Sequence, residues 1–160
     1  MDPRCRLTPA RPIGRAGVVL SITLLLLVGC RDRGVPEPRI LVLGADTIIL
    51  PDTIGLVDVR VGGEAGESFD PASPTARVGD IVRFISGNGA THAVAFDGSQ
   101  LHAGALEFLE GTGQLRGPPL LTSDAAWILS LDGAPPGGYP FTCLTHGTRG
   151  RLTVSARVPR

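Results

Sequence analysis

Hydrophobic and polar residues alternate in several short stretches of this 160-residue chain, and the alternation is clearest near its C-terminal end. In one stretch Tyr139, Phe141 and Cys143 fall on one face of an extended strand, with the intervening residues on the other. A second stretch directs Leu152 and Val154 inward in the same way. The pattern therefore predicts two β-strands and places the Cys143 thiol among aromatic core side chains.

Other alternating or apolar stretches predict further strands, and one stretch has helical spacing instead. The predicted strands are residues 40–43, 47–50, 56–61, 81–86, 92–96 and 127–131, and the helix or flap lies near residues 101–110. In residues 92–96 the alternation points His92 inward together with Val94 and Phe96. With 22 Gly and 14 Pro, the composition is typical of short strands joined by tight turns, as in an all-β sandwich or barrel.

The N-terminal residues have the plan of an export signal. Four Arg residues lie within residues 1–15, and residues 16–29 form an apolar run that is shorter than the roughly 20 residues of a membrane span. The run ends in LVGC, Leu27 to Cys30, which is similar to the bacterial lipobox. That resemblance implies lipid attachment to Cys30 and cleavage before it, with an uncleaved anchor helix as the alternative.

The chain is thus expected to have four parts. These are a signal peptide (1–29), a tether (30–39), an N-terminal extension without assigned function (40–55) and one folded domain (56–160). The domain is predicted to lie in the cell envelope, on the periplasmic side, held to a membrane through Cys30.

Charge and cysteine placement narrow the function. All fifteen basic residues are Arg, the chain has no net charge, and eleven Arg against fourteen acids leave −3 from Cys30 onward, so nothing indicates nucleic-acid binding. Cys5 and Cys30 belong to the leader and its end, which makes Cys143 the single thiol of the folded domain. A lone thiol in an exported protein is exposed to oxidation, so its presence suggests metal ligation.

Two histidines can join this thiol at one end of the sheet. His146 follows Cys143 by three residues, and His92 points inward from its own strand. VGDIVRF (78–84), His92 at the head of a strand, and GGYPFTCLTHGTRGRLTV (137–154) together resemble the cupredoxins, whose signature is G-x-Y-x-F-x-C-x-x-H-G. The resemblance covers about residues 57–154.

This resemblance implies a Greek-key β-sandwich that binds one copper ion through His92, Cys143 and His146. Two imidazoles and a thiolate serve both Cu(I) and Cu(II), so little rearrangement accompanies electron transfer. The family carries single electrons without turning over a substrate, and its exposed histidine, here His146, is the electron entry point. A redox partner is expected to dock transiently on a monomeric domain, over a small uncharged rim. The rim is predicted to comprise Gly87, Gly89, Pro135, Pro136, Gly147 and Thr148.

The chain departs from the family pattern at two positions. The loop after His146 contains no Met, and Met1 is the only methionine, so the axial donor is missing. Thr148, or the carbonyl of Thr91 or Ala90, is a candidate weak donor, and a three-coordinate site with a raised reduction potential is expected. Ala93 also stands where relatives often carry an Asn that braces the site.

Several alternatives stay open at this point. Zinc could use the same three ligands with a water in the fourth position, and His102 could be a fourth ligand if residues 101–110 fold over the site, although a surface position is favoured. A Cys/His nucleophilic enzyme is disfavoured because no orienting Asn or Asp and no oxyanion loop can be recognised. A copper-sequestering or chaperone module, or a metal-free binding domain, is the competing function.

Overall fold

The computed structural model describes residues 39–43, 46–63 and 66–158, all within one unit, Glu37–Arg160. The predicted signal peptide, the lipobox with Cys30 and nearly all of the tether lie outside the described residues. Among the residues that are described, no helix has the length and apolar character needed to cross a membrane.

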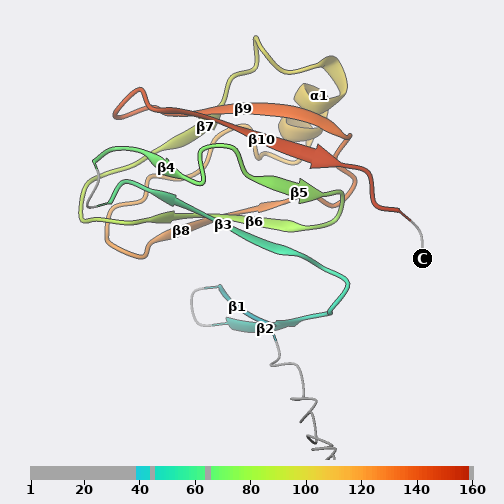
Figure 1. Cartoon of the computed structure of the whole chain (residues 1–160), viewed down its shortest axis with the longest axis horizontal. Coiled ribbons are helices and arrows are strands. Elements are labelled where there is room, and N and C mark those ends of the chain that lie inside the picture. The colour runs from blue at the N-terminus through green and yellow to red at the C-terminus, as the bar shows by residue number, and fades with distance from the viewer. Residues whose placement is uncertain (1–38, 44–45, 64–65, 159–160) are drawn as a thin grey trace, which may run out of the picture. The chain divides into compact units, whose positions relative to one another are not determined.

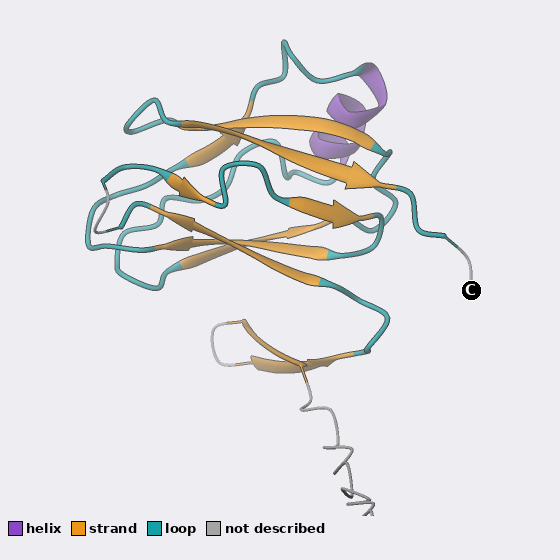
Figure 2. Ribbon diagram, in the orientation of Figure 1, coloured by secondary structure: helices purple, strands orange, loops and turns teal. Residues whose placement is uncertain are grey.

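Two four-stranded sheets pack face to face (Figures 1 and 2). One sheet has the order β4 (Phe69–Asp70), β3 (Leu56–Val61), β6 (Ile81–Ser86), β8 (Ala126–Ser130), and the other has the order β5 (Thr75–Arg77), β10 (Arg149–Ser155), β9 (Gly137–Cys143), β7 (Val94–Phe96). The pairs β3–β6 and β5–β10 are parallel, and the remaining pairs are antiparallel. The predicted all-β sandwich is confirmed.

The core lies between the sheets and follows the predicted alternation. Tyr139, Phe141 and Cys143 on β9 are each at most 1% exposed. Phe141 meets Phe84 of the opposite sheet edge to face, with ring centroids 5.1 Å apart, and Phe84 stacks on Trp127 at 5.3 Å. Such aromatic pairs contribute about 0.5–1.5 kcal/mol beyond the area they bury, so they fix β9 firmly against the sheet below it.

The smaller elements agree with the sequence except in two places. The hairpin of β1 (Arg39–Leu43) and β2 (Asp46–Leu50) and the helix α1 (Ala103–Gly111) were expected from the pattern. The short strands β4 and β5 were not, because residues 69–80 contain two prolines and little alternation. In Figure 1, α1 lies at the right, where β9 begins, and the turn after Cys143 lies at the left. The two ends of β9 therefore have different surroundings.

Candidate metal centre

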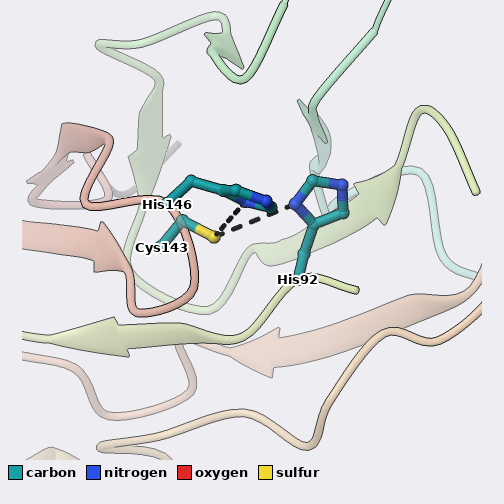
Figure 3. Close-up of side chains that lie close together, drawn as sticks. All are labelled: His92, Cys143 and His146. Carbon is teal, nitrogen blue, oxygen red and sulfur yellow. Dashed lines mark hydrogen bonds between the residues drawn. The ribbon is translucent and has the colours of Figure 1, made fainter. Parts of the chain in front are cut away.

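Three side chains from distant parts of the sequence meet at the end of β9. Ligand atoms of His92, Cys143 and His146 all lie within 4.8 Å of one another. The Cys143 Sγ atom is 3.8 Å from His92 Nδ1 and 3.5 Å from His146 Nδ1 (Figure 3). Both imidazoles thus turn the same nitrogen toward the sulfur.

The turn after β9 positions two of these residues. Cys143 is the last residue of the strand, and its backbone N–H donates to the Thr148 carbonyl at 2.8 Å. The Gly147 N–H donates back to the Cys143 carbonyl at 2.7 Å, with Gly147 at a φ of 71° that favours glycine. These two bonds close a tight loop that returns His146 over the thiol, and the His146 side chain is 25% exposed.

His92 reaches the site from a short extended segment just before β7. Its backbone N–H donates to the Leu120 carbonyl at 3.0 Å, and Leu120 N–H donates to the His92 carbonyl at 2.8 Å. The side chain is completely buried, as the alternation predicted. His92 stands outside β7 itself, and the segment that contains Leu120 holds it in an isolated bridge.

Asn88 fixes the protonation of the His92 ring. Its Oδ1 atom accepts the Ala90 N–H at 3.0 Å, so this atom is an oxygen and the 2.8 Å contact with His92 Nε2 is a hydrogen bond that the imidazole donates. The proton on Nε2 leaves a lone pair on Nδ1, the atom that faces Cys143. Asn88 thereby braces His92 from a different position in the chain, since the bracing Asn expected at position 93 is replaced by Ala.

The environment keeps this imidazole neutral. Burial lowers the pKa of His92, the nearby His146 lowers this pKa further, and the Glu67 carboxylate acts in the opposite direction. Because burial is the largest of the three effects, the neutral ring is favoured near pH 7, and a neutral imidazole is the form that binds metals.

Gly62 gives the loops room to close around His92. A Cβ atom at this position would lie 2.6 Å from the Asn88 amide nitrogen and 2.8 Å from the His92 ring, and the Gly62 φ is 72°. The Gly62 N–H donates to the Ser68 carbonyl at 2.8 Å, which folds the segment between β3 and β4 back toward the site.

Sequence reasoning missed one charged residue in that segment. The Glu67 Oε2 atom lies 3.6 Å from His92 Nδ1 and 3.3 Å from His146 Nδ1. Thr148, a candidate axial donor, donates its hydroxyl to the Glu67 backbone carbonyl at 2.5 Å. Thr91 immediately precedes His92 and has an exposed side chain. The absence of a Met after His146 was the one feature of the sequence that drew attention to other oxygen atoms near the site.

Three other expected positions lie at the far end of β9. His102 is the N-cap of α1, where its Nδ1 accepts the Ala105 N–H at 3.3 Å, and it packs near Tyr139. Pro135 and Pro136 immediately precede β9, eight and seven residues before Cys143. They therefore do not border the site, because a strand of this length separates its ends by roughly 20 Å.

Two exposed apolar side chains neighbour the site in their place. Leu144 follows Cys143, its N–H donates to the Ala93 carbonyl at 2.7 Å, and it is 48% exposed. Leu121 follows the residue that pairs with His92 and is 64% exposed. The rim beside His146 therefore includes apolar surface as well as glycine and threonine.

Comparison with known proteins identifies one curated relative. No family model matches the chain. A plastocyanin from Scenedesmus fuscus is 29% identical over 103 residues, covering 61% of this chain and 98% of that protein. Among solved structures, oxidized plastocyanin from Dryopteris crassirhizoma is 24% identical with a TM-score of 0.48, covering 62% of this chain and 100% of the other. A purple cupredoxin from Nitrosopumilus maritimus is 19% identical with a TM-score of 0.46, covering 62% and 99%.

Proposed function

Because this chain belongs to the cupredoxin family, we propose that it binds one copper ion through His92, Cys143 and His146 and carries single electrons outside the cytoplasm. The observation that carries the proposal is the meeting of the Cys143 sulfur with two imidazole Nδ1 atoms at 3.5 and 3.8 Å. A carrier of this kind exchanges electrons with a docked partner and needs no bound substrate.

The two sulfur-to-nitrogen distances fit donors that share one ion. Bonds from a first-row metal to nitrogen and sulfur are about 2.0–2.3 Å, so two donors on one ion at trigonal to tetrahedral angles lie about 3.4–3.8 Å apart. Both measured sulfur-to-nitrogen distances fall in this range. Copper supplies one-electron chemistry, and a thiolate with two neutral imidazoles suits both of its oxidation states.

Burial of the donors favours an electron carrier over a module that delivers copper. His92 and Cys143 are shielded from solvent, and the Asn88 and Leu120 contacts hold His92 in one position. A site that passes its ion to another protein would need ligands that can leave it, whereas only His146 reaches the surface, with 25% of its side chain exposed. The edge of this ring is therefore the electron path, and Leu144 and Leu121 form an apolar rim for brief docking.

The test is a titration of the full chain, purified in detergent, with Cu(II). We expect an intense visible thiolate-to-copper band that saturates at one copper per chain and bleaches reversibly when ascorbate is added. Zn(II) should compete for the same site without colour. Oxidation of Cys143 without a visible band would contradict the proposal.

The export and anchoring part of the proposal rests on residues 1–30. The Arg-rich start, the apolar run 16–29 and LVGC support export and a lipid on Cys30. In a bacterial host fed a labelled fatty acid, the wild-type chain should carry label and a Cys30→Ser variant should not. Equal labelling of a Cys30→Ser chain would contradict lipid attachment, and a Cys5→Ser variant serves as the matched control.

A further inference from the structure

The Glu67 carboxylate faces both imidazole donors at the distance of a shared ligand. Its Oε2 atom is 3.6 Å from His92 Nδ1 and 3.3 Å from His146 Nδ1, and neither contact has hydrogen-bond geometry. These separations are similar to the two sulfur-to-nitrogen distances, 3.8 and 3.5 Å. The carboxylate lies on the imidazole side of the group, in the loop between β3 and β4.

Two contacts hold Glu67 in this position. The Asn88 side-chain amide donates to Glu67 Oε1 at 3.4 Å, and the Thr148 hydroxyl donates to the Glu67 carbonyl. Asn88 is the residue that accepts the proton of His92 Nε2, and Thr148 belongs to the loop that carries His146. The Glu67 segment is thus tied to both histidine-bearing segments, and its Oε2 atom is left facing the donors.

The Asn88 contact leaves His92 Nδ1 without a proton for Glu67. Because Nε2 donates to the Asn88 oxygen, Nδ1 of this tautomer carries a lone pair. A carboxylate oxygen 3.6 Å from this nitrogen and 3.3 Å from His146 Nδ1 is stabilised by a cation close to all three atoms. A metal ion held by the two Nδ1 atoms supplies that cation and accepts the carboxylate as a donor.

We propose that Glu67 is the fourth ligand of the copper centre, a carboxylate oxygen in the role for which this chain lacks a methionine. The inference rests on the proposed copper function and assigns a residue that the family signature does not contain. The Thr148 hydroxyl is already used to hold the Glu67 segment in place. Glu67 closes the site on the imidazole side, while Cys143 remains the only sulfur donor.

A carboxylate changes the properties expected of the site. Oxygen donors and negative charge favour Cu(II) over Cu(I), because Cu(II) is the harder and more highly charged ion. The reduction potential is therefore lowered, which reverses the direction expected from the absence of methionine alone. In a Glu67→Gln variant, the ratio of the affinity for Cu(II) to the affinity for Cu(I) should fall at least tenfold. A tenfold fall corresponds to a rise of about 59 mV in the one-electron reduction potential.

The experiment compares copper-loaded wild-type, Glu67→Gln and Glu67→Met chains with a Glu107→Gln control. Glu107 is an exposed residue of α1, at the far end of β9, so its variant removes the same charge away from copper. We expect the thiolate-to-copper band in all four chains. Only the Glu67 variants should change the relative intensities of the visible bands and the copper hyperfine splitting and raise the potential, Glu67→Met by more than Glu67→Gln.

X-ray absorption at the copper edge of the wild-type chain gives a second measurement that needs no variant. It should count three nitrogen or oxygen donors and one sulfur in the first shell, and two light donors in Glu67→Met. A count of two in the wild type overturns the inference, even if Glu67→Gln raises the potential through its charge alone. Spectra of Glu67→Gln identical to those of Glu107→Gln also overturn it. In either case a normal band leaves the copper function standing, whereas a wild-type chain without a band overturns both.

Discussion

The polar side chains at the two ends of strand β9 have different kinds of partners. At the end where the strand begins, the Tyr139 hydroxyl donates to the Pro135 carbonyl at 2.6 Å, and His102 accepts the Ala105 N–H at the start of α1. Each polar group there meets a partner of the complementary kind. The hydrogen bonds at this end are therefore satisfied by protein groups.

At the end where the strand stops, side chains able to bind a metal face one another. The Cys143 sulfur lies 3.5 and 3.8 Å from the two imidazole Nδ1 atoms, and the Glu67 carboxylate lies 3.3 and 3.6 Å from the same two nitrogens. Such a group is stable only with protons or a cation inside it. The contrast supports the proposed metal site: one end of the strand pairs its polar groups with backbone partners, whereas the other gathers a sulfur and two imidazole nitrogens within 4.8 Å of one another.

Removing the Cys143 sulfur should have the largest effect on the copper spectrum, while a change at the other end of β9 should have none. A Cys143→Ser variant should lose the visible thiolate-to-copper band entirely, because no other thiol lies among the described residues. Tyr139→Phe, at the other end of the same strand, should keep the band. Optical spectra of the two copper-loaded variants measure this, and a band that persists in Cys143→Ser would show that the sulfur ligand is assigned wrongly.

The second-largest effect is expected from filling the space beside His92. Gly62→Ala puts a Cβ atom 2.6–2.8 Å from Asn88 and the His92 ring at a φ of 72°. Gly113, with a φ of 69° and no atom within 4 Å of its Cβ position, is the matched control for the backbone cost of about 1 kcal/mol. Gly62→Ala should lose a further 1–3 kcal/mol, roughly, in free energy of unfolding and bind copper more weakly. Equal losses in the two variants would show that the approach to His92 is unimportant.

Removing the brace on His92 should weaken the site without abolishing it. Asn88→Ala frees the imidazole to change tautomer and releases Glu67, so copper affinity should fall by about tenfold. Asn88→Asp keeps an oxygen for His92 Nε2 but loses the amide that donates to Glu67, so it should recover only the part of the affinity that depends on the His92 tautomer. Competition with a copper chelator measures both, and an Asn88→Ala chain that binds as tightly as the wild type would count against the tautomer argument.

The smallest effect on the free energy of unfolding is expected at the end where β9 begins. Tyr139→Phe removes one hydrogen bond and should cost about 1 kcal/mol. Burial raises the pKa of Tyr139, so the unfolded chain releases this proton first, and stability falls as pH rises above about 10. Denaturant unfolding should show that this alkaline loss is smaller in Tyr139→Phe than in the wild type. An unchanged alkaline profile would mean that another group causes it.

The alternation of apolar and polar residues predicted the strands well, because every second side chain of β9 and β10 is buried. Tyr139, Phe141 and Cys143 are buried as expected, and the alternation around His92 was correct. The sequence also contained the Cys143 and His146 spacing that one tight loop closes. These features depend on neighbours in the chain, which a sequence displays directly.

The remainder of the site depends on contacts between distant segments. Glu67 reaches the site because β3 pairs in parallel with β6 and the Gly62 segment folds back, and neither event leaves a local pattern. The contact between Asn88 and His92 likewise depends on how the intervening loop folds, which the local pattern does not display. Pro135 and Pro136 were misplaced because proximity to Cys143 in sequence does not say which end of the strand they occupy.

The most direct test of the central claim is anomalous diffraction at the copper edge from crystals of the copper-loaded chain. We expect one anomalous peak per chain, bonded to Cys143 Sγ and to the Nδ1 atoms of His92 and His146. A peak elsewhere on the surface, or one bonded to fewer than these three atoms, would contradict it.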